Sequence, residues 1–197
     1  MDNLKEIIES LDGWCSLEKA NLMYNLVLEN KPNLIVELGV YGGRSLVPMA
    51  LAQLENGAGV IKGIDPWSID ASLEGNHTEQ SLGGWEGVNY PYIYERCSKA
   101  IDNHKLTNCE LIRMKSQDAV NLFVDNSIDI LHQDGNHSEE LTCLEVELYM
   151  SKLKSGGYWI SDDVNFDTIK KSLKLIEQHC DLIPHNAKTP FAVYKKR

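Results

Sequence analysis

The chain alternates between short apolar runs rich in β-branched residues and segments in which apolar residues recur every three or four positions. Runs of the first kind predict strands buried on both faces, and the second spacing predicts amphipathic helices. Their alternation indicates an α/β domain with a parallel sheet and right-handed crossovers. We expect strands at residues 34–38, 60–64, 110–114, 128–132 and 158–161, closing strands at 181–183 and 191–194, and helices near 45–54, 98–104, 118–123, 141–148 and 169–176.

Residues 1–31 precede this alternation. Their apolar residues have helical spacing on both sides of a break at Gly13, and Pro32 ends the segment. We interpret it as an N-terminal helical cover.

The pattern is lost between residues 66 and 96, where aromatic side chains are mixed with Gly, Asn, Ser and acids. A loop of this length inside a compact domain is uncommon unless it is a lid or a binding loop. We therefore expect a substrate-lid insert. Its aromatic side chains either bind the acceptor or pack the insert against the body or a second subunit. They are Trp67, Trp85, Tyr90, Tyr92 and Tyr94.

The helix expected after the fourth strand has one apolar stripe, formed by Leu141, Leu144 and Leu148. We place its four acids on the outer face and expect the Ser-Gly-Gly sequence at residues 155–157 to end it. The acids are Glu139, Glu140, Glu145 and Glu147.

Composition bounds the domain count and the partners. The 197 residues, 43% of them hydrophobic, suffice for one core, so a single domain over residues 1–197 is expected. A net charge of −10 would repel nucleic acid and anionic membranes. The five cysteines are scattered, without a C-x-x-C motif, and no signal peptide or membrane-spanning run is present. A cytoplasmic, soluble protein with reduced thiols is expected.

The loop after the first strand, residues 37–45, contains glycines that permit a tight turn close to a ligand. It lacks the G-x-G-x-x-G spacing with which dinucleotide-binding loops admit a pyrophosphate, which disfavours a nicotinamide-dependent oxidoreductase. Glu37 suits a cationic ligand such as a sulfonium or an amine. The alternative is a turn that only joins strand to helix.

Polar residues also follow the second and third strands. Asp65 is placed to accept the hydroxyl hydrogens of a ribose, although it could equally begin a turn before Pro66. The sequence Ser116-Gln117-Asp118 places polar groups where an adenine edge would lie, although Asp118 could instead cap the next helix.

Acidic residues end the fourth and fifth strands: Asp134 on one, Asp162 and Asp163 on the other. If the strands are neighbours, their ends lie about 5 Å apart. Carboxylates this close repel one another unless a cation joins them, and oxygen ligands select Mg²⁺, Ca²⁺ or Mn²⁺. The alternative is one helix cap and two solvated acids. His137, three residues after Asp134, could reach a metal-bound hydroxyl and act as a base, although a lone histidine in a loop is usually only a polar surface residue.

Four motifs together resemble class I S-adenosylmethionine-dependent methyltransferases of the macrocin O-methyltransferase-like branch (methyltransferase family 24-like). The resemblance spans about residues 34–194. The motifs are VELGVYGGRS (36–45), GIDPW (63–67), DGNHS (134–138) and LKSGG (153–157) leading to Asp162-Asp163.

The resemblance implies a three-layer, Rossmann-like, doubly wound sheet of about seven strands, mostly parallel with the last antiparallel. It implies base catalysis by His137 and metal ligation by Asp134, Asp162 and Asp163. The sequence departs from the family at Gln133, where an apolar residue is usual, and at Asn136, which often aligns with an acid. Cofactor contacts are expected at Glu37, Gly39, Tyr41, Ser45, Asp65, Ser116, Asp118 and Asp134.

The expected function is that of an O-methyltransferase that uses S-adenosylmethionine and a divalent cation, Mg²⁺ or another hard cation. The expected acceptor is a sugar or another small molecule with vicinal oxygens. His137 would remove the hydroxyl proton before the oxygen attacks the methyl group. A cofactor-binding protein without turnover is the alternative of another class. A homo-oligomer is compatible with these features.

Overall fold

The computed structural model describes residues 2–82 and 84–197, with side chains from Leu4 onward. Seven strands form one sheet in the order β3-β2-β1-β4-β5-β7-β6, and β7 runs antiparallel to both of its neighbours. The expected α/β sheet with an antiparallel last strand is therefore confirmed. The strands are β1 (Leu34–Leu38), β2 (Val60–Ile64), β3 (Cys109–Ile112), β4 (Ile128–Gln133), β5 (Leu153–Ser161), β6 (Cys180–Ile183) and β7 (Ala192–Lys196).

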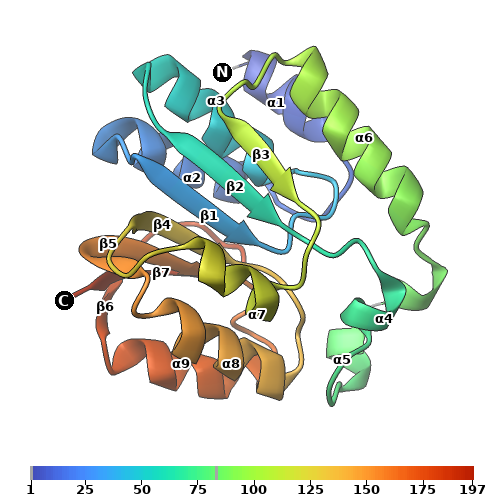
Figure 1. Ribbon diagram of the computed structural model, residues 1–197, viewed down its shortest axis with the longest axis vertical. Helices are drawn as coiled ribbons and strands as arrows, with labels where there is room; N and C mark the ends of the chain where they lie inside the picture. Colours follow the sequence, from blue (N-terminus) through green and yellow to red (C-terminus); the bar gives the residue numbers. More distant parts are fainter. Residues whose placement is uncertain (1, 83) are drawn as a thin grey trace.

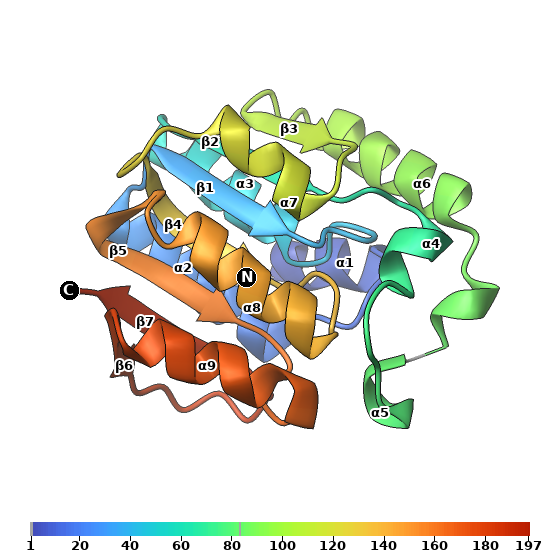
Figure 2. The ribbon, with the colours of Figure 1, turned by 60° about the horizontal axis from the view of Figure 1, so that its bottom comes forward.

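Helices cover both faces of the sheet (Figures 1 and 2). In β1, Ile35 packs into the core on one face and Val36 into the core on the other, and both are fully buried because side chains alternate along a strand. One face is covered by α1 (Asp2–Ser10), α2 (Leu17–Asn30), α3 (Leu46–Asn56) and α6 (Tyr90–Asn103), and the other by α7 (Ser116–Ala119), α8 (Glu139–Tyr149) and α9 (Lys170–Glu177). Short 3-10 helices lie at Val120–Leu122 (η2) and Asp167–Ile169 (η3).

The insert after β2 is more ordered than its sequence indicated. It contains α4 (Ile69–Ser72), α5 (Glu79–Leu82) and the 3-10 helix η1 (Trp85–Gly87), and α6 begins at Tyr90. The helix expected only near residues 98–104 is thus much longer. Asn89 caps it by accepting a hydrogen bond from the backbone N–H of Tyr92, and Pro91 suits its first turn. The first half of this helix alternates polar and aromatic residues, so it lacks the three-to-four-residue apolar spacing that predicts a helix.

The prediction that residues 155–157 end a helix is wrong. The helix α8 ends at Tyr149, and β5 already begins at Leu153, so Ser155-Gly156-Gly157 lies inside the strand. The pairing of β5 with β4 shifts register here. Glycine suits both positions, because Gly156 has φ +77° and a Cβ on Gly157 would lie only 2.9 Å from the carbonyl oxygen of Asp129. These glycines make a bulge rather than a helix end.

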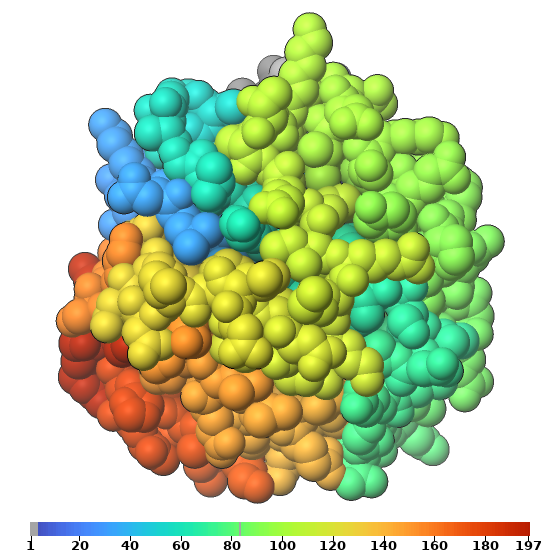
Figure 3. Space-filling view, viewed as in Figure 1, coloured from blue at the N-terminus to red at the C-terminus, as the bar shows by residue number. Residues whose placement is uncertain are grey.

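The insert lies beyond the carboxyl ends of β1, β2 and β3 (Figure 1). Asn136, in the loop after β4, donates hydrogen bonds to the carbonyls of Ala71 and Glu74, both 2.9 Å long. Two further contacts join the insert to the body. Lys115 forms an ion pair with Glu74, and the side-chain amide of Asn76 donates a hydrogen bond to Glu140. In Figure 3 the insert accordingly forms one continuous surface with the body. The side-chain amide of Asn136 is therefore an anchor of the insert.

No helix in residues 2–82 and 84–197 combines the length and the apolar character needed to cross a bilayer.

Candidate active site

Two adjoining cavities open at the carboxyl ends of β1, β4 and β5, where parallel sheets bind their ligands. The larger has a volume of about 400 Å³, within the range of small-molecule sites. The narrower one lies against the ends of β1, β2 and β4. Five residues line both cavities: Gly39, Tyr41, Trp85, Asp134 and His137.

Asp65 organises the glycine loop beside the narrower cavity. Its carboxylate accepts hydrogen bonds from the backbone N–H groups of Val40 (3.0 Å), Tyr41 (2.9 Å) and Trp67 (2.6 Å). Tyr41 and Trp67 have φ of 50° and 44°, a conformation that bulky side chains rarely adopt. Burial raises the pKa of Asp65, whereas these three hydrogen bonds act to lower it. Asp65 thus holds a strained loop and also lines the cavity where a ribose is expected.

We expect Asp65→Asn to lower both thermal stability and the affinity for S-adenosylhomocysteine. The amide supplies one acceptor oxygen, so at least one backbone N–H loses its partner, at about 1–3 kcal/mol. Asp129→Asn is the matched control, because Asp129 also accepts two backbone N–H groups, those of Asn33 and Leu34, but at the other end of the sheet. Calorimetric unfolding and ligand titration should show lower stability for both variants and weaker binding for Asp65→Asn alone. Equal affinity in both would contradict this role.

Glu37 is fully buried below the loop and is not among the described residues that line the two cavities. It accepts a hydrogen bond from the Ser45 hydroxyl, and its Oε1 lies 3.4 Å from Nδ1 of His132. Nε2 of His132 in turn lies 3.7 Å from Oδ2 of Asp134. The carboxylate of Glu37 therefore does not line a cavity itself and is linked to Asp134 only through His132. Ser45, by contrast, lines the larger cavity.

A buried polar chain supports the wall of the narrower cavity. Gln133 donates to Oε2 of Glu145 (2.9 Å) and accepts from the indole N–H of Trp159 (3.2 Å). Glu145 accepts from the hydroxyl of Ser116 (2.6 Å), and both of these residues line the cavity. The expectation that Glu145 faces outward is wrong, since the residue is 3% exposed. The hydrogen bonds with Glu145 and Trp159 explain why a polar residue, Gln133, can be buried at the end of β4.

Asp118, predicted beside Ser116, is exposed in the first turn of α7 and is not among the lining residues. Lys115 is the N-cap residue of that helix, so Asp118 is not its cap either. Ser116 and Gln117, the other two residues expected at an adenine edge, do line the cavity.

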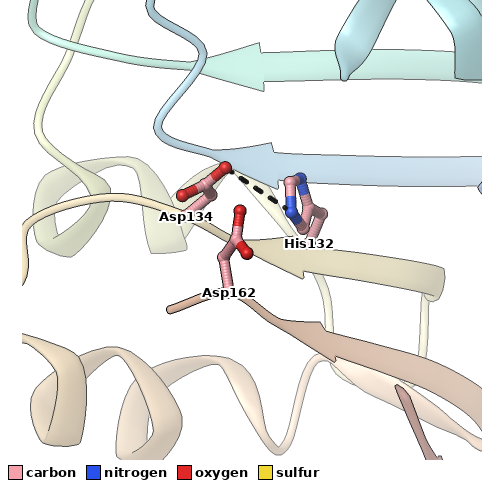
Figure 4. Close-up of side chains that lie close together, drawn as sticks. All are labelled: His132, Asp134 and Asp162. Carbon is pink, nitrogen blue, oxygen red and sulfur yellow. Dashed lines mark ion pairs between the residues drawn. The ribbon is translucent and has the colours of Figure 1, made fainter. Parts of the chain in front are cut away.

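The ends of β4 and β5 bring Asp134 and Asp162 together, as predicted (Figure 4). The ammonium group of Lys19, from the first turn of α2, pairs with Asp162 and lies 3.5 Å from Asp134 Oδ2. The side chain of Lys19 is only 2% exposed. Sequence reasoning had placed this lysine in a helical cover, 115 and 143 positions from its two partners.

Burial and the neighbouring Asp162 raise the pKa of the Asp134 carboxyl well above its ordinary value. Burial acts in the same direction on Asp162, but the ammonium of Lys19, a hydrogen bond with Asp134 and the nearby His132 together outweigh burial and lower the pKa of Asp162. For Lys19 burial acts to lower the pKa, and the two carboxylates outweigh burial and raise it. The ammonium thus balances the charge of Asp162 and is itself firmly protonated.

Two groups of side chains among the described residues bring possible metal ligands within 4.8 Å of one another, and Asp134 belongs to both. One adds His132 and Asp162, and the other adds His137 and Asp163. The three carboxylates predicted as one ligand set thus fall into two groups.

The ammonium of Lys19 lies between Asp134 and Asp162, and a divalent ion placed there would be repelled at close range. The residues therefore do not fit a cation held jointly by Asp134, Asp162 and Asp163. The three carboxylates predicted from the sequence are thus not one metal site, and no chemical step is derived from Mg²⁺.

His137 stands between the two cavities. Its Nε2 lies 3.1 Å from Oδ2 of Asp163, and its ring packs edge-on against Phe166 and Trp85. The side chain is 12% exposed, so solvent still reaches it. A carboxylate beside one ring nitrogen fixes the imidazole and leaves the other nitrogen available for a proton.

The aromatic residues of the insert divide between the two roles considered above. Trp67 is 1% exposed and donates its indole N–H to the carbonyl of Tyr41 (2.9 Å), so it packs the insert against the body. Trp85 lines both cavities and packs edge-on against Trp14, whose side chain is 69% exposed. Trp14 lies in the N-terminal segment and also lines the larger cavity, so two indoles in contact, one from each segment, border this cavity.

The N-terminal segment is the part of the site that sequence reasoning missed. Trp14, Cys15 and Lys19 line the larger cavity. Ser16, whose hydroxyl caps α2, was the available signal, because it fixes where the helix begins and hence which residues lie in its first turn. Which end of this helix meets the sheet edge is not encoded in its periodicity.

Comparisons with known proteins bear on the fold and the family. A family model described as a methyltransferase domain matches residues 36–164. A comparison with curated proteins gives no match. Among solved structures, cofactor-bound Rv0187 from MTB has a TM-score of 0.71 and 12% identity, and the match covers 100% of this chain and 88% of that one.

Two further structures share the fold. The SAH-bound methyltransferase PaMTH1 of Podospora anserina has a TM-score of 0.68 and 13% identity, with 100% of this chain and 88% of that chain covered. The O-methyltransferase TomG of Streptomyces achromogenes, involved in tomaymycin synthesis and solved with SAM, has a TM-score of 0.68 and 12% identity, with 100% and 90% covered. At these identities the likeness concerns the fold.

Proposed function

This chain belongs to the methyltransferase-domain family, and from that premise we propose that it transfers the methyl group of S-adenosylmethionine to a hydroxyl oxygen of a small molecule. Membership confirms the expected class I methyltransferase. One observation carries the proposal: two cavities share Asp134 and His137 as a common wall, so that a cofactor in one can meet an acceptor in the other.

The narrower cavity suits the nucleoside part of the cofactor. A carboxylate, a hydroxyl and an amide line it at Asp65, Ser116 and Gln117, a donor and acceptor set that matches a nucleoside. Gly39 allows the loop to approach closely, and the acid Asp134 lies where an amino group or a sulfonium would be favoured. The neighbours solved with SAM or SAH have the same fold.

The larger cavity suits the acceptor. Indole and phenyl rings from Trp14, Trp85 and Phe166 line it, and such faces pack well against a sugar or a planar ring. Its volume of about 400 Å³ admits a small molecule. That the acceptor carries vicinal oxygens stays a prediction, since it depended on chelation of a metal.

His137 accepts the hydroxyl proton of the acceptor at the ring nitrogen that does not face Asp163. The oxygen then forms a bond to the methyl carbon as the bond from carbon to sulfur breaks, and the electron pair stays on sulfur. The leaving sulfur is neutral and needs no acid. The remaining contribution of the chain is to hold the two reactants in line.

Titration calorimetry tests the cofactor. We expect S-adenosylhomocysteine to bind in the micromolar range and NAD to bind negligibly, because the loop lacks the glycines of a dinucleotide site. A panel of sugar and catechol acceptors, read by mass spectrometry for one added methyl group, then tests transfer. Tight NAD binding without binding of S-adenosylhomocysteine would contradict the proposal.

A further inference from the structure

Lys19 is the only lysine or arginine among the buried residues of the described chain. Burying an ammonium group is costly unless it is paired, and lysine is rarely found fully buried. Here Asp134 and Asp162 accept its hydrogen bonds, and the ring of Phe191 lies 5.8 Å from its Nζ. The site therefore contains a built-in positive charge at the junction of β4 and β5.

This charge occupies the gap in which the acidic residues would otherwise need a metal ion. Asp134 and Asp162 follow adjacent parallel strands, so their carboxylates meet whatever else the site contains. An ammonium or a divalent ion can relieve their repulsion, but the two cannot share one gap. The carboxylate of Asp163 pairs with His137, and these two side chains form the second group of possible ligands beside Asp134, outside the gap that Lys19 fills.

We propose that the ammonium group of Lys19 takes the place of a divalent cation between Asp134 and Asp162, so that methyl transfer by this protein requires no metal. The inference rests on the proposed function for its chemical consequence. An ammonium group has three N–H donors. Two serve Asp134 and Asp162, and because Lys19 lines the larger cavity the third is left for the acceptor oxygen.

The positive charge stabilises the acceptor oxygen as its proton passes to His137. Lys19 keeps its own protons throughout, so no further reactant is needed. The one remaining N–H of Lys19 can donate to a single acceptor oxygen, whereas a metal ion would chelate two, so an acceptor with a single hydroxyl suffices here.

The test begins with Mn²⁺ binding to the wild-type protein, measured by electron paramagnetic resonance without acceptor, and with transfer rates in EDTA and in Mg²⁺. We expect no bound Mn²⁺ at micromolar concentrations and equal rates. Stoichiometric Mn²⁺ binding, or activity that EDTA removes and Mg²⁺ restores, would overturn the inference. The binding measurement decides even if no acceptor is found, which separates this inference from the proposed function.

The variant Lys19→Met then vacates the gap. We expect it to bind one Mn²⁺ and to transfer methyl groups about 10²–10³-fold more slowly without metal, with partial recovery in Mg²⁺. The control Lys171→Met removes an exposed lysine paired with Glu139 and should behave as wild type. A folded Lys19→Met that binds no Mn²⁺ would refute the substitution of lysine for metal. If that variant does not fold, the wild-type measurements decide.

Discussion

His137→Ala is expected to reduce the turnover number about 10²–10⁴-fold, the usual contribution of a positioned general base. The imidazole lies between the two cavities and beside Asp163, so its loss removes the proton acceptor without removing the cofactor site. The affinity for S-adenosylhomocysteine should stay within a few-fold of wild type. Methyl transfer by mass spectrometry and ligand titration measure the two quantities.

The matched control for this variant is His179→Ala, because His179 is exposed after the end of α9 and far from the cavities. It should leave both quantities unchanged. Asp163→Asn should give an intermediate loss, since Asp163 orients the imidazole but does not take the proton. If His137→Ala kept most of the wild-type turnover, another group would have to be the base.

Gly39→Ala is expected to abolish cofactor binding and to destabilise the fold. A Cβ at this position would lie 2.0 Å from the carbonyl oxygen of Asp134, and φ is +83°. The clash is with a backbone segment that cannot easily move, because the N–H of Gly39 donates to the carbonyl of Ile64 and the N–H of Asp134 donates to the carbonyl of Leu38. The loop or the end of β4 must move, which should cost about 2–4 kcal/mol of unfolding free energy and displace the wall that both cavities share.

Gly57→Ala is the control for backbone strain alone. Gly57 also has a positive φ, +72°, but a Cβ there would meet nothing within 4 Å. Gly57→Ala should lower the free energy of unfolding by only about 1 kcal/mol and leave the affinity for S-adenosylhomocysteine unchanged. Denaturant unfolding and titration calorimetry compare the two variants. Equal losses would show that the contact with Asp134 does not matter.

The elements of the sheet were well predicted, and so was the edge at which the site lies. Buried strands such as residues 34–38 and 60–64 have the expected boundaries because an apolar run closed by a glycine or an acid is a local signal. The start of α6 and the bulge at Gly156 were missed, since aromatic residues and glycines carry weaker periodic information.

The candidate site was predicted in part. Parallel strands end at one edge, which is why Asp65, Asp134 and His137 could be assigned to it without coordinates. Glu145 was assigned to the wrong face because four acids on one short helix hide which of them is buried.

By itself, then, the sequence determined an α/β methyltransferase fold and the acids and histidine at its carboxyl edge, because strand ends and helix periodicity are read from neighbouring residues. Only the tertiary structure decided that Lys19 lies between Asp134 and Asp162 and that Glu37 stands behind His132. Helix periodicity gives a buried face but not the partner beneath it. That partner is chosen by how α2 packs on a sheet formed more than a hundred residues later.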